Sequence, residues 1–142
     1  MSESLEKEIA GRLTAVQKRI EETAERAGRD PAEITLVAVT KTWPSEVLVA
    51  AFNAGIRDIG ENRAEELARK RTELQGTFAE GDPLVWHQIG TLQSRKTRLV
   101  AQNADVFHAL DRVKVANRLS SQLVEIGRVL PVLLEVNLSG EG

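Results

Sequence analysis

The chain contains 142 residues, the usual length of a single globular domain. A hydrophobic content of 42%, a charged content of 28% and a net charge of −2 are ordinary for a soluble protein, and they give no reason to expect nucleic acid as a partner. The absence of cysteine excludes disulfides and thiolate metal sites, no apolar run is long enough to span a membrane, and the acidic N-terminal stretch is unlike a signal peptide, so we expect a cytoplasmic protein.

The first predicted element is a helix over residues 3–27. Its apolar residues recur every three or four positions and therefore lie along one face. These residues are Leu5, Ile9, Leu13, Val16 and Ile20. Gly28, followed by Asp30 and Pro31, predicts the end of the helix. We expect residues 1–28 to form an N-terminal helix that precedes the rest of the domain, residues 34–142.

Apolar strands then alternate with helices along the remaining chain. Strands are predicted over residues 34–40, 56–60, 84–89, 105–110 and 131–138, and helices over residues 45–54, 63–74, 94–102 and 112–126. This alternation predicts βαβ crossovers and a parallel sheet, and hence the α/β class. The first and last strands are almost wholly apolar, which is typical of strands buried on both faces of a parallel sheet.

Two architectures fit this order of elements, an open doubly wound sheet and part of a (β/α)8 TIM barrel. No helix follows the last strand, and a buried parallel strand left uncovered is an unusual end for a domain. A complete eight-unit barrel needs about 200 residues or more. We therefore expect residues 1–142 to be a single barrel domain that is incomplete at its C-terminus, with about five of the eight strands present.

The first predicted strand stops at a single amine, that of Lys41. In α/β proteins the chemistry gathers at the C-terminal ends of the strands. A lysine at the mouth of an apolar barrel is partly desolvated, so its neutral amine can attack a carbonyl group and form a Schiff base. The alternative is that Lys41 simply ends the strand and points into water.

Polar residues also end or follow the other strands, and a barrel would bring them to one mouth. They are Glu61, Asn62, His87, Gln88, Gln93, His108, Asp111, Glu135, Asn137 and Ser139. Structural alternatives exist, because the histidines could be hydrogen-bonded core or rim residues, Glu61 and Asn62 could cap the next helix, and Ser139 could belong to a turn. The basic cluster over residues 95–98 favours a solvated helix face. No metal-ligand spacing or nucleotide-binding glycine loop is present, so no metal is expected.

Five blocks of the sequence resemble, in order and spacing, consecutive motifs of one family. They are Leu-Val-Ala-Val-Thr-Lys over residues 36–41, Gly-Glu-Asn over 60–62, Trp-His-Gln-Ile-Gly-Thr-Leu-Gln-Ser over 86–94, His-Ala-Leu-Asp over 108–111 and Pro-Val-Leu-Leu-Glu-Val-Asn-Leu-Ser-Gly-Glu over 131–141. The family is the YggS/PROSC family of pyridoxal 5′-phosphate (PLP) homeostasis proteins. The resemblance covers essentially the whole chain, and the combination of blocks is what makes it specific.

The resemblance implies a PLP fold-type III barrel, similar to the N-terminal domain of alanine racemase and preceded by an extra N-terminal helix. The implied cofactor is PLP, held as a Schiff base on Lys41. Asn62, His87, Asn137 and Ser139 align with strand-end positions that line the cofactor pocket. No catalytic residue is implied, because the family is linked to PLP carriage and vitamin B6 homeostasis without an established turnover. PLP-dependent apo-enzymes are the implied partners, and the full-length form is implied to be a monomer or weak dimer.

The sequence departs from the family pattern at Thr91, where a second histidine is common. It also ends before the strands whose loops usually hold the phosphate of PLP in such barrels. The main alternative is a fold-type III PLP enzyme such as an amino-acid racemase or decarboxylase. Racemisation is disfavoured because the chain contains no tyrosine and has Ser45 where alanine racemase carries that residue. A Schiff-base aldolase is a third reading, although its lysine is expected on a late strand.

Overall fold

Five parallel strands form a single sheet in the computed structural model, which describes residues 2–140. The strands are β1 (Ala38–Val39), β2 (Asp58–Glu61), β3 (Val85–Gln88), β4 (Val106–Leu110) and β5 (Val132–Leu134), in the order β1-β2-β3-β4-β5. Each strand pairs in parallel with the next strand of the chain. A doubly wound sheet reverses its strand order at a switch point, whereas a barrel continues in one direction. The sequential order therefore confirms the predicted partial barrel.

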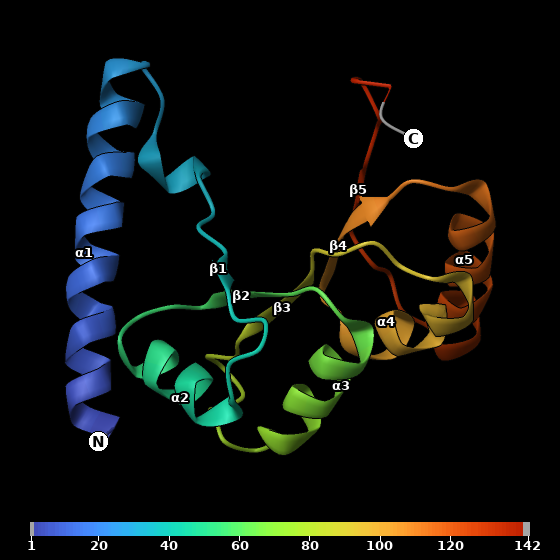
Figure 1. Ribbon diagram of the computed structural model, residues 1–142, viewed down its shortest axis with the longest axis horizontal. Coiled ribbons are helices and arrows are strands. Elements are labelled where there is room, and N and C mark those ends of the chain that lie inside the picture. The colour runs from blue at the N-terminus through green and yellow to red at the C-terminus, as the bar shows by residue number, and fades with distance from the viewer. Residues whose placement is uncertain (1, 141–142) are drawn as a thin grey trace.

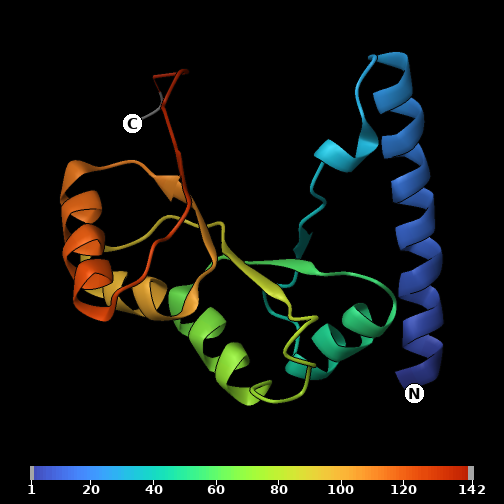
Figure 2. The ribbon, with the colours of Figure 1, turned by 180° about the vertical axis from the view of Figure 1, so that it is seen from behind.

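Helices cover one side of this sheet and leave the other side open (Figures 1 and 2). The helices are α1 (Ser2–Arg26), α2 (Ser45–Asn53), α3 (Ala64–Glu73), α4 (Thr97–Asn103) and α5 (Val113–Ile126), with short 3-10 turns η1 (Pro31–Glu33) and η2 (Ser94–Lys96). The extra helix α1 packs beside α2, where Asn53 Nδ2 donates to Glu6 Oε1 at 2.7 Å. Within residues 2–140, no helix combines the length and the apolar character that a membrane span requires.

The core lies between the sheet and the helices α2 to α5. Ile59, Trp86 and Phe107, on the adjacent strands β2, β3 and β4, are buried in one apolar cluster. The helices contribute Leu48, Leu67, Val100, Val115 and Leu119 to the same cluster. Because side chains alternate across a strand, the intervening residues of β2, β3 and β4 face the open side of the sheet.

Glycine residues end two of the helices close to the predicted positions. Gly28 follows α1 with a φ of 68°, and Arg29 N donates to Ala24 O at 2.9 Å across the helix end. Gly127 follows α5 with a φ of 66°. Glycine adopts this left-handed conformation without steric cost, so both helix ends could be predicted from the sequence.

The outer strands are much shorter than predicted, and the expectation that they are buried on both faces is wrong. β1 comprises two residues of the predicted 34–40, and β5 comprises three of the predicted 131–138. Each has one neighbouring strand within residues 2–140, and β1 pairs only with residues 59 and 60 of β2. Val39 is 50% exposed and Leu134 is 74% exposed, because no described segment covers the open face at these positions.

Candidate functional site at the carboxyl ends of the strands

Lys41 lies just beyond the carboxyl end of β1, as the sequence predicts, with Thr40 between them, in a tight turn over residues 40–43. Trp43 N donates to Thr40 O at 3.1 Å and closes this turn. Lys41 is exposed, so the partial desolvation expected at an apolar barrel mouth is not found among the described residues. Its ammonium group forms no ion pair or hydrogen bond with residues 2–140. The amine is therefore accessible to a ligand that approaches the end of β1.

Two open cavities, which share Thr91 in their linings, border the ends of the strands. The first, of about 600 Å³, includes Asn62, Arg63, Glu66, Gln93 and Lys96, and the second, of about 810 Å³, includes Asp111, Glu135, Asn137 and Ser139. The structure thus brings Asn62, Asn137 and Ser139 to one edge of the sheet. Asn137 Oδ1 also accepts a hydrogen bond from Gly140 N at 2.9 Å, so Ser139 lies within a turn as well as at a cavity.

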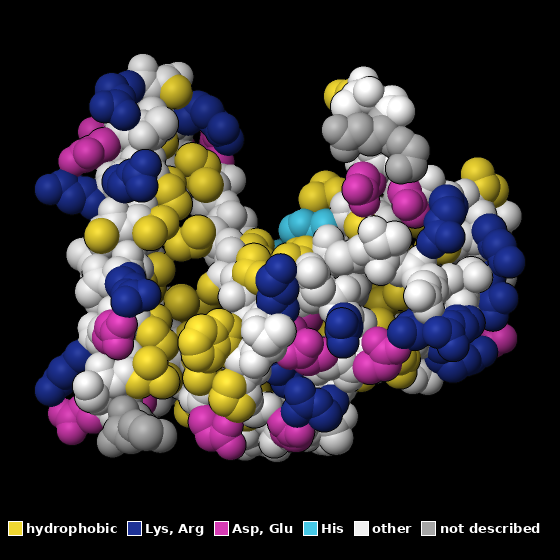
Figure 3. Space-filling view, in the orientation of Figure 1, with side chains coloured by type: hydrophobic (Ala, Val, Ile, Leu, Met, Phe, Trp, Pro, Cys, Tyr) yellow, Lys and Arg dark blue, Asp and Glu magenta, His cyan; other side chains and the backbone are white. Residues whose placement is uncertain are grey.

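A hydrogen-bonded chain of three side chains crosses β2, β3 and β4 on the open face of the sheet. His87 Nε2 lies 2.8 Å from Asp58 Oδ1, and His87 Nδ1 lies 2.8 Å from His108 Nε2. If His87 Nε2 donates to Asp58 Oδ1, His87 Nδ1 is the acceptor for the Nε2–H of His108. Figure 3 shows histidine side chains at the floor of the hollow between α1 and the C-terminal segment.

The structural alternative therefore holds for both histidines, with His87 a buried core residue and His108 a half-buried one at the rim. His87 is buried and both of its ring nitrogens have protein partners, so neither nitrogen is left for a ligand. Burial is the main cause that holds the pKa of His108 below its ordinary value of 6.5. The neutral form of His108 is favoured in the folded chain.

A fully buried lysine beside the Lys41 turn is the main feature that the sequence reasoning missed. Lys70 Nζ donates to Glu61 Oε1 at 2.5 Å and to Thr40 O at 2.8 Å, and it pairs with Glu66 Oε1 at 2.9 Å. Glu61 is fully buried as well and also accepts a hydrogen bond from Thr40 Oγ1 at 2.8 Å. Glu66 Oε1 in turn accepts from Thr42 N at 2.8 Å. These groups bind the backbone on both sides of Lys41.

A sequence signal for this lysine was available. The buried residues of α3 and its C-cap recur every three or four positions, and Lys70 occupies one of those positions. They are Ala64, Leu67, Lys70 and Leu74. Glu66 precedes Lys70 by four residues, the spacing at which helical side chains meet. The alternative in which Glu61 caps α3 is wrong, because this carboxylate is directed to Lys70 and the N-cap residue Arg63 forms no side-chain cap.

The basic cluster over residues 95–98 is a helix face, as predicted. Arg95 and Arg98 are exposed, and Lys96 forms an ion pair with Glu65. Arg98 pairs with Glu125 at 3.3 Å. Among residues 2–140, no group of three or more histidine and carboxylate side chains is arranged to hold a metal ion.

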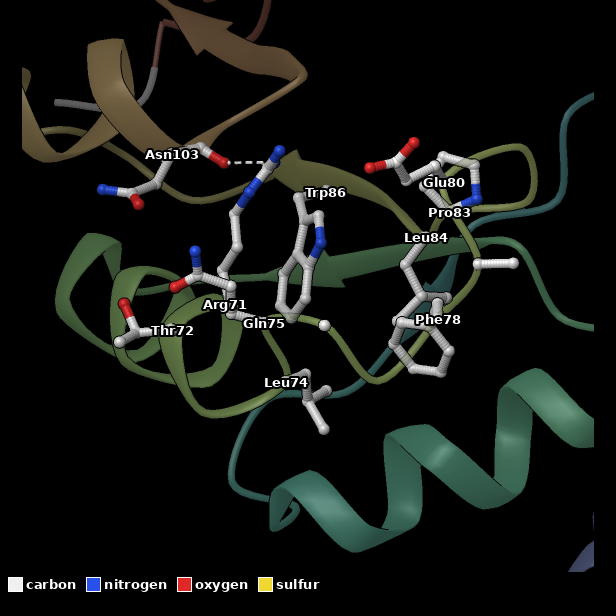
Figure 4. A pocket seen from close by; sticks show the side chains of 12 residues that line it. Arg71, Thr72, Leu74, Gln75, Phe78, Glu80, Pro83, Leu84, Trp86 and Asn103 are labelled. Carbon is white, nitrogen blue, oxygen red and sulfur yellow. Dashed lines mark hydrogen bonds between the residues drawn. The ribbon is translucent and has the colours of Figure 1, made fainter.

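A further cavity, of about 420 Å³, lies on the helix-covered side of the sheet (Figure 4). Arg71 of α3 crosses one end of it and donates to Asn103 O at 2.7 Å and to Asp105 Oδ2 at 3.0 Å. Trp86 and Phe78 supply apolar walls. None of the predicted site residues lines this cavity, and Arg71 is already paired.

Comparison with known proteins identifies close relatives, although no protein-family model matches the chain. Proteins named pyridoxal phosphate homeostasis protein are 45% identical over 133 residues in Pseudomonas aeruginosa, 42% over 134 residues in Escherichia coli K12 and 38% over 133 residues in Pasteurella multocida. Each alignment covers 94% of this chain and 56% of the relative. The chain therefore spans about half the length of the curated relatives it matches, and the resemblance predicted from the five blocks is confirmed.

Solved structures support the same relationship. A protein of unknown function from Bifidobacterium adolescentis matches with a TM-score of 0.87 and 35% identity, covering 97% of this chain and 58% of the other. PipY of Synechococcus elongatus PCC7942, solved with PLP bound, matches with a TM-score of 0.72 and 34% identity, covering 86% of this chain and 56% of PipY. The barrel-type sheet and its helices are thus shared with a protein that binds PLP.

Proposed function

We propose that this chain, a homologue of the proteins named pyridoxal phosphate homeostasis protein, binds PLP and serves PLP (vitamin B6) homeostasis. The observation that carries the proposal is the exposed amine of Lys41, without a partner among residues 2–140, at the carboxyl end of β1 in a sheet shared with PLP-bound PipY. Within this proposal, residues 1–142 act as one unit of a barrel domain.

The residues at the strand ends fit the chemistry of this cofactor. PLP carries an aldehyde that a primary amine can attack, and Lys41 supplies that amine. When bound, the cofactor would supply this carbonyl group, and a Schiff base with the Lys41 nitrogen would release the aldehyde oxygen as water. Asn62, Asn137 and Ser139 bring amide and hydroxyl groups to the same edge of the sheet, where a polar cofactor needs donors and acceptors.

His87 enters the proposal in a supporting role. Because Asp58 and His108 engage both ring nitrogens, His87 would border the cofactor pocket through its ring instead of binding through a nitrogen. The same pairing supports carriage without turnover, since it leaves His87 without a free nitrogen for acid-base work. The chain also contains no tyrosine that could act as a second base.

We extend the proposal to partners and location. A protein that carries PLP would deliver it to PLP-dependent apo-enzymes in the cytoplasm, and its full-length form would be a monomer or weak dimer. The absence of cysteine and the net charge of −2 are consistent with these assignments.

The test is to mix the purified chain with PLP, record the absorbance spectrum, reduce with borohydride and map the adduct by peptide mass spectrometry. We expect the absorbance of a Schiff base and one major adduct at Lys41. Lys41→Ala should lose that adduct and keep the far-UV circular dichroism of the wild type, because the side chain is exposed and has no partner in residues 2–140. Lys18→Ala, which removes an exposed lysine of α1, is the matched control.

Two results would count against the assignment. Equal amounts of trapped PLP in Lys41→Ala and wild type would remove Lys41 from the site. An adduct spread over exposed lysines such as Lys18, in proportion to their exposure, would mean that PLP reacts with the surface without a binding site. Amino-acid substrates added to the loaded protein then separate a carrier from an enzyme, because only an enzyme consumes them catalytically.

A further inference from the structure

We propose that Lys70, Glu61 and Glu66 form an ionic clamp, fully buried at Lys70 and Glu61, that positions Lys41 by holding the turn over residues 40–43. The inference rests on the proposed function, because it assigns to these residues the task of presenting the Lys41 amine. Lys70 and Glu61 are fully buried and away from any ligand, and Glu66, which borders the first cavity, is assigned here through its bond to Thr42 N, so all three are positioning residues. Two observations point to them: the backbone is strained at Thr42, and charged side chains form hydrogen bonds with the backbone of Thr40 and Thr42.

The strain lies at the residue that follows Lys41. Thr42 has a φ of 68°, and it is the one residue other than glycine with a positive φ within residues 2–140. A β-branched side chain in this region clashes with its own backbone, so the conformation persists only where surrounding contacts enforce it. Strain of this kind gathers at functional positions, and here it lies beside the proposed cofactor amine.

The clamp supplies contacts on both sides of Lys41. Thr40 O, before the lysine, accepts hydrogen bonds from Trp43 N at 3.1 Å and from Lys70 Nζ at 2.8 Å. Thr42 N, after the lysine, donates to Glu66 Oε1 at 2.8 Å. The same carboxylate oxygen pairs with Lys70 Nζ at 2.9 Å, so one ammonium group connects both anchors.

Burial makes the clamp rigid. The side chains of Lys70 and Glu61 are fully buried, and the 2.5 Å contact between their charged atoms links α3 to the end of β2. A buried ammonium group must keep all its acceptors, because an unpaired charge in the interior is strongly unfavourable. Glu66 Oε1 and Thr40 O are two of those acceptors. The turn cannot move away without leaving the Lys70 charge partly unsatisfied.

If Lys70 only stabilised the fold, the hydrogen bond from Thr42 N to Glu66 would not be needed. Lys70 could be satisfied by Glu61 and by backbone carbonyls of the sheet without a bond from Glu66 to the strained residue. The directed contact between Glu66 and Thr42 N instead fixes the one backbone position where Lys41 leaves the strand. A fixed backbone at Lys41 reduces the number of positions that its long side chain can sample before it meets a ligand.

The test compares Glu66→Gln with wild type by two measurements that do not need PLP. The first is hydrogen–deuterium exchange of the Thr42 amide, followed by NMR. The second is the rate at which acetic anhydride acylates Lys41, relative to the other exposed lysines. Loss of a charge-assisted bond should raise Thr42 exchange about tenfold and change the relative Lys41 rate by at least about twofold. PLP trapped at Lys41 by borohydride should fall about fivefold or more at limiting PLP.

Two controls make the result specific to the turn. Glu125→Gln removes an exposed ion pair on α5 in the same way and should leave all three readouts within twofold of wild type. Thr42→Gly keeps the amide donor and relieves the left-handed strain, so adding it to Glu66→Gln should restore part of the lost trapping. That rescue is expected only where the clamp acts by holding a strained turn.

The outcomes separate the clamp from the proposed function. The clamp would be overturned if Glu66→Gln changed Thr42 exchange and Lys41 acylation no more than Glu125→Gln does. This holds whatever amount of PLP is trapped at Lys41. A Glu66→Gln effect on both measurements, with no PLP adduct at Lys41 in the wild type, would retain the clamp as a device that orders the turn and would overturn the cofactor role of Lys41. No rescue by Thr42→Gly would overturn the part played by strain.

Discussion

The buried pair formed by Lys70 and Glu61 predicts a large loss of stability when one partner is removed. Lys70→Met keeps the length and the apolar part of the side chain and removes the charge. The Glu61 carboxylate then stays fully buried with the Thr40 hydroxyl as its remaining partner, and its second oxygen already lacks a partner among the described residues. Leaving one charge of a buried pair uncompensated costs about 3–5 kcal/mol.

That cost is a large part of the total, because domains of this kind unfold with a free energy of about 5–15 kcal/mol. The melting temperature should fall by on the order of 10 °C or more. Urea unfolding at neutral pH, followed by far-UV circular dichroism, measures the change as a lower midpoint with an unchanged slope. Lys7→Met, which removes an exposed ion pair with Glu3 one helical turn away, should leave the midpoint near that of the wild type.

A second substitution tests whether the loss comes from the stranded charge. Lys70→Met combined with Glu61→Gln removes both charges and keeps the shape of the acceptor, so most of the stability should return. A loss below about 1 kcal/mol in Lys70→Met alone would refute the reasoning, because it would show that water or another group compensates Glu61. An equal loss in the single and double variants would show that packing, and not charge, is responsible.

Two further predictions concern the same end of the sheet. Acidification below pH 4.5 should destabilise the protein, because the hydrogen bond from Lys70 holds the pKa of Glu66 below its ordinary value of 4.5. The stabilising contribution of Glu66 is complete above pH 4.5, and it is lost as the pH falls through the lower pKa of the folded state. Urea midpoints measured through this range should fall less steeply in Glu66→Gln, and identical slopes would contradict the assignment. Gly90→Ala should cost about 1–3 kcal/mol or more, because its Cβ would lie 2.3 Å from Asn62 O. Gly81→Ala, whose Cβ would meet no atom within 4 Å, should be neutral in the same urea assay, and equal midpoints for both variants would disprove the clash.

The order of the elements could be predicted because each signal is local. Gly28 and Gly127 end helices through their own backbone conformation, and the strand–helix alternation requires parallel crossovers wherever it occurs. These features depend on a few neighbouring residues. The sheet order, which depends on where the strands meet, followed from the barrel hypothesis and not from any local pattern.

The lengths of β1 and β5 could not be predicted in the same way. A strand is defined by hydrogen bonds to a partner, and the apolar residues of segment 34–40 say nothing about how many partner residues β2 offers. Burial of Val39 and Leu134 was inferred from composition, yet burial also depends on what covers the face, which a single strand cannot specify.

The candidate site shows the same division between local and non-local information. Lys41 and Asn62 were predicted because each lies at or just after the end of a predicted strand, a relation visible in the sequence, and their roles toward PLP were implied by the family resemblance. Lys70 was overlooked because an acidic and basic helix such as α3 is usually a solvated face, although its position among Leu67 and Leu74 marks it as inward. A lysine on an apolar stripe needs buried acceptors, and α3 can find them only at the neighbouring strand ends. Those strand ends also carry the proposed site. A charged residue on the buried stripe of a barrel helix therefore indicates which strand end is fixed by buried polar contacts.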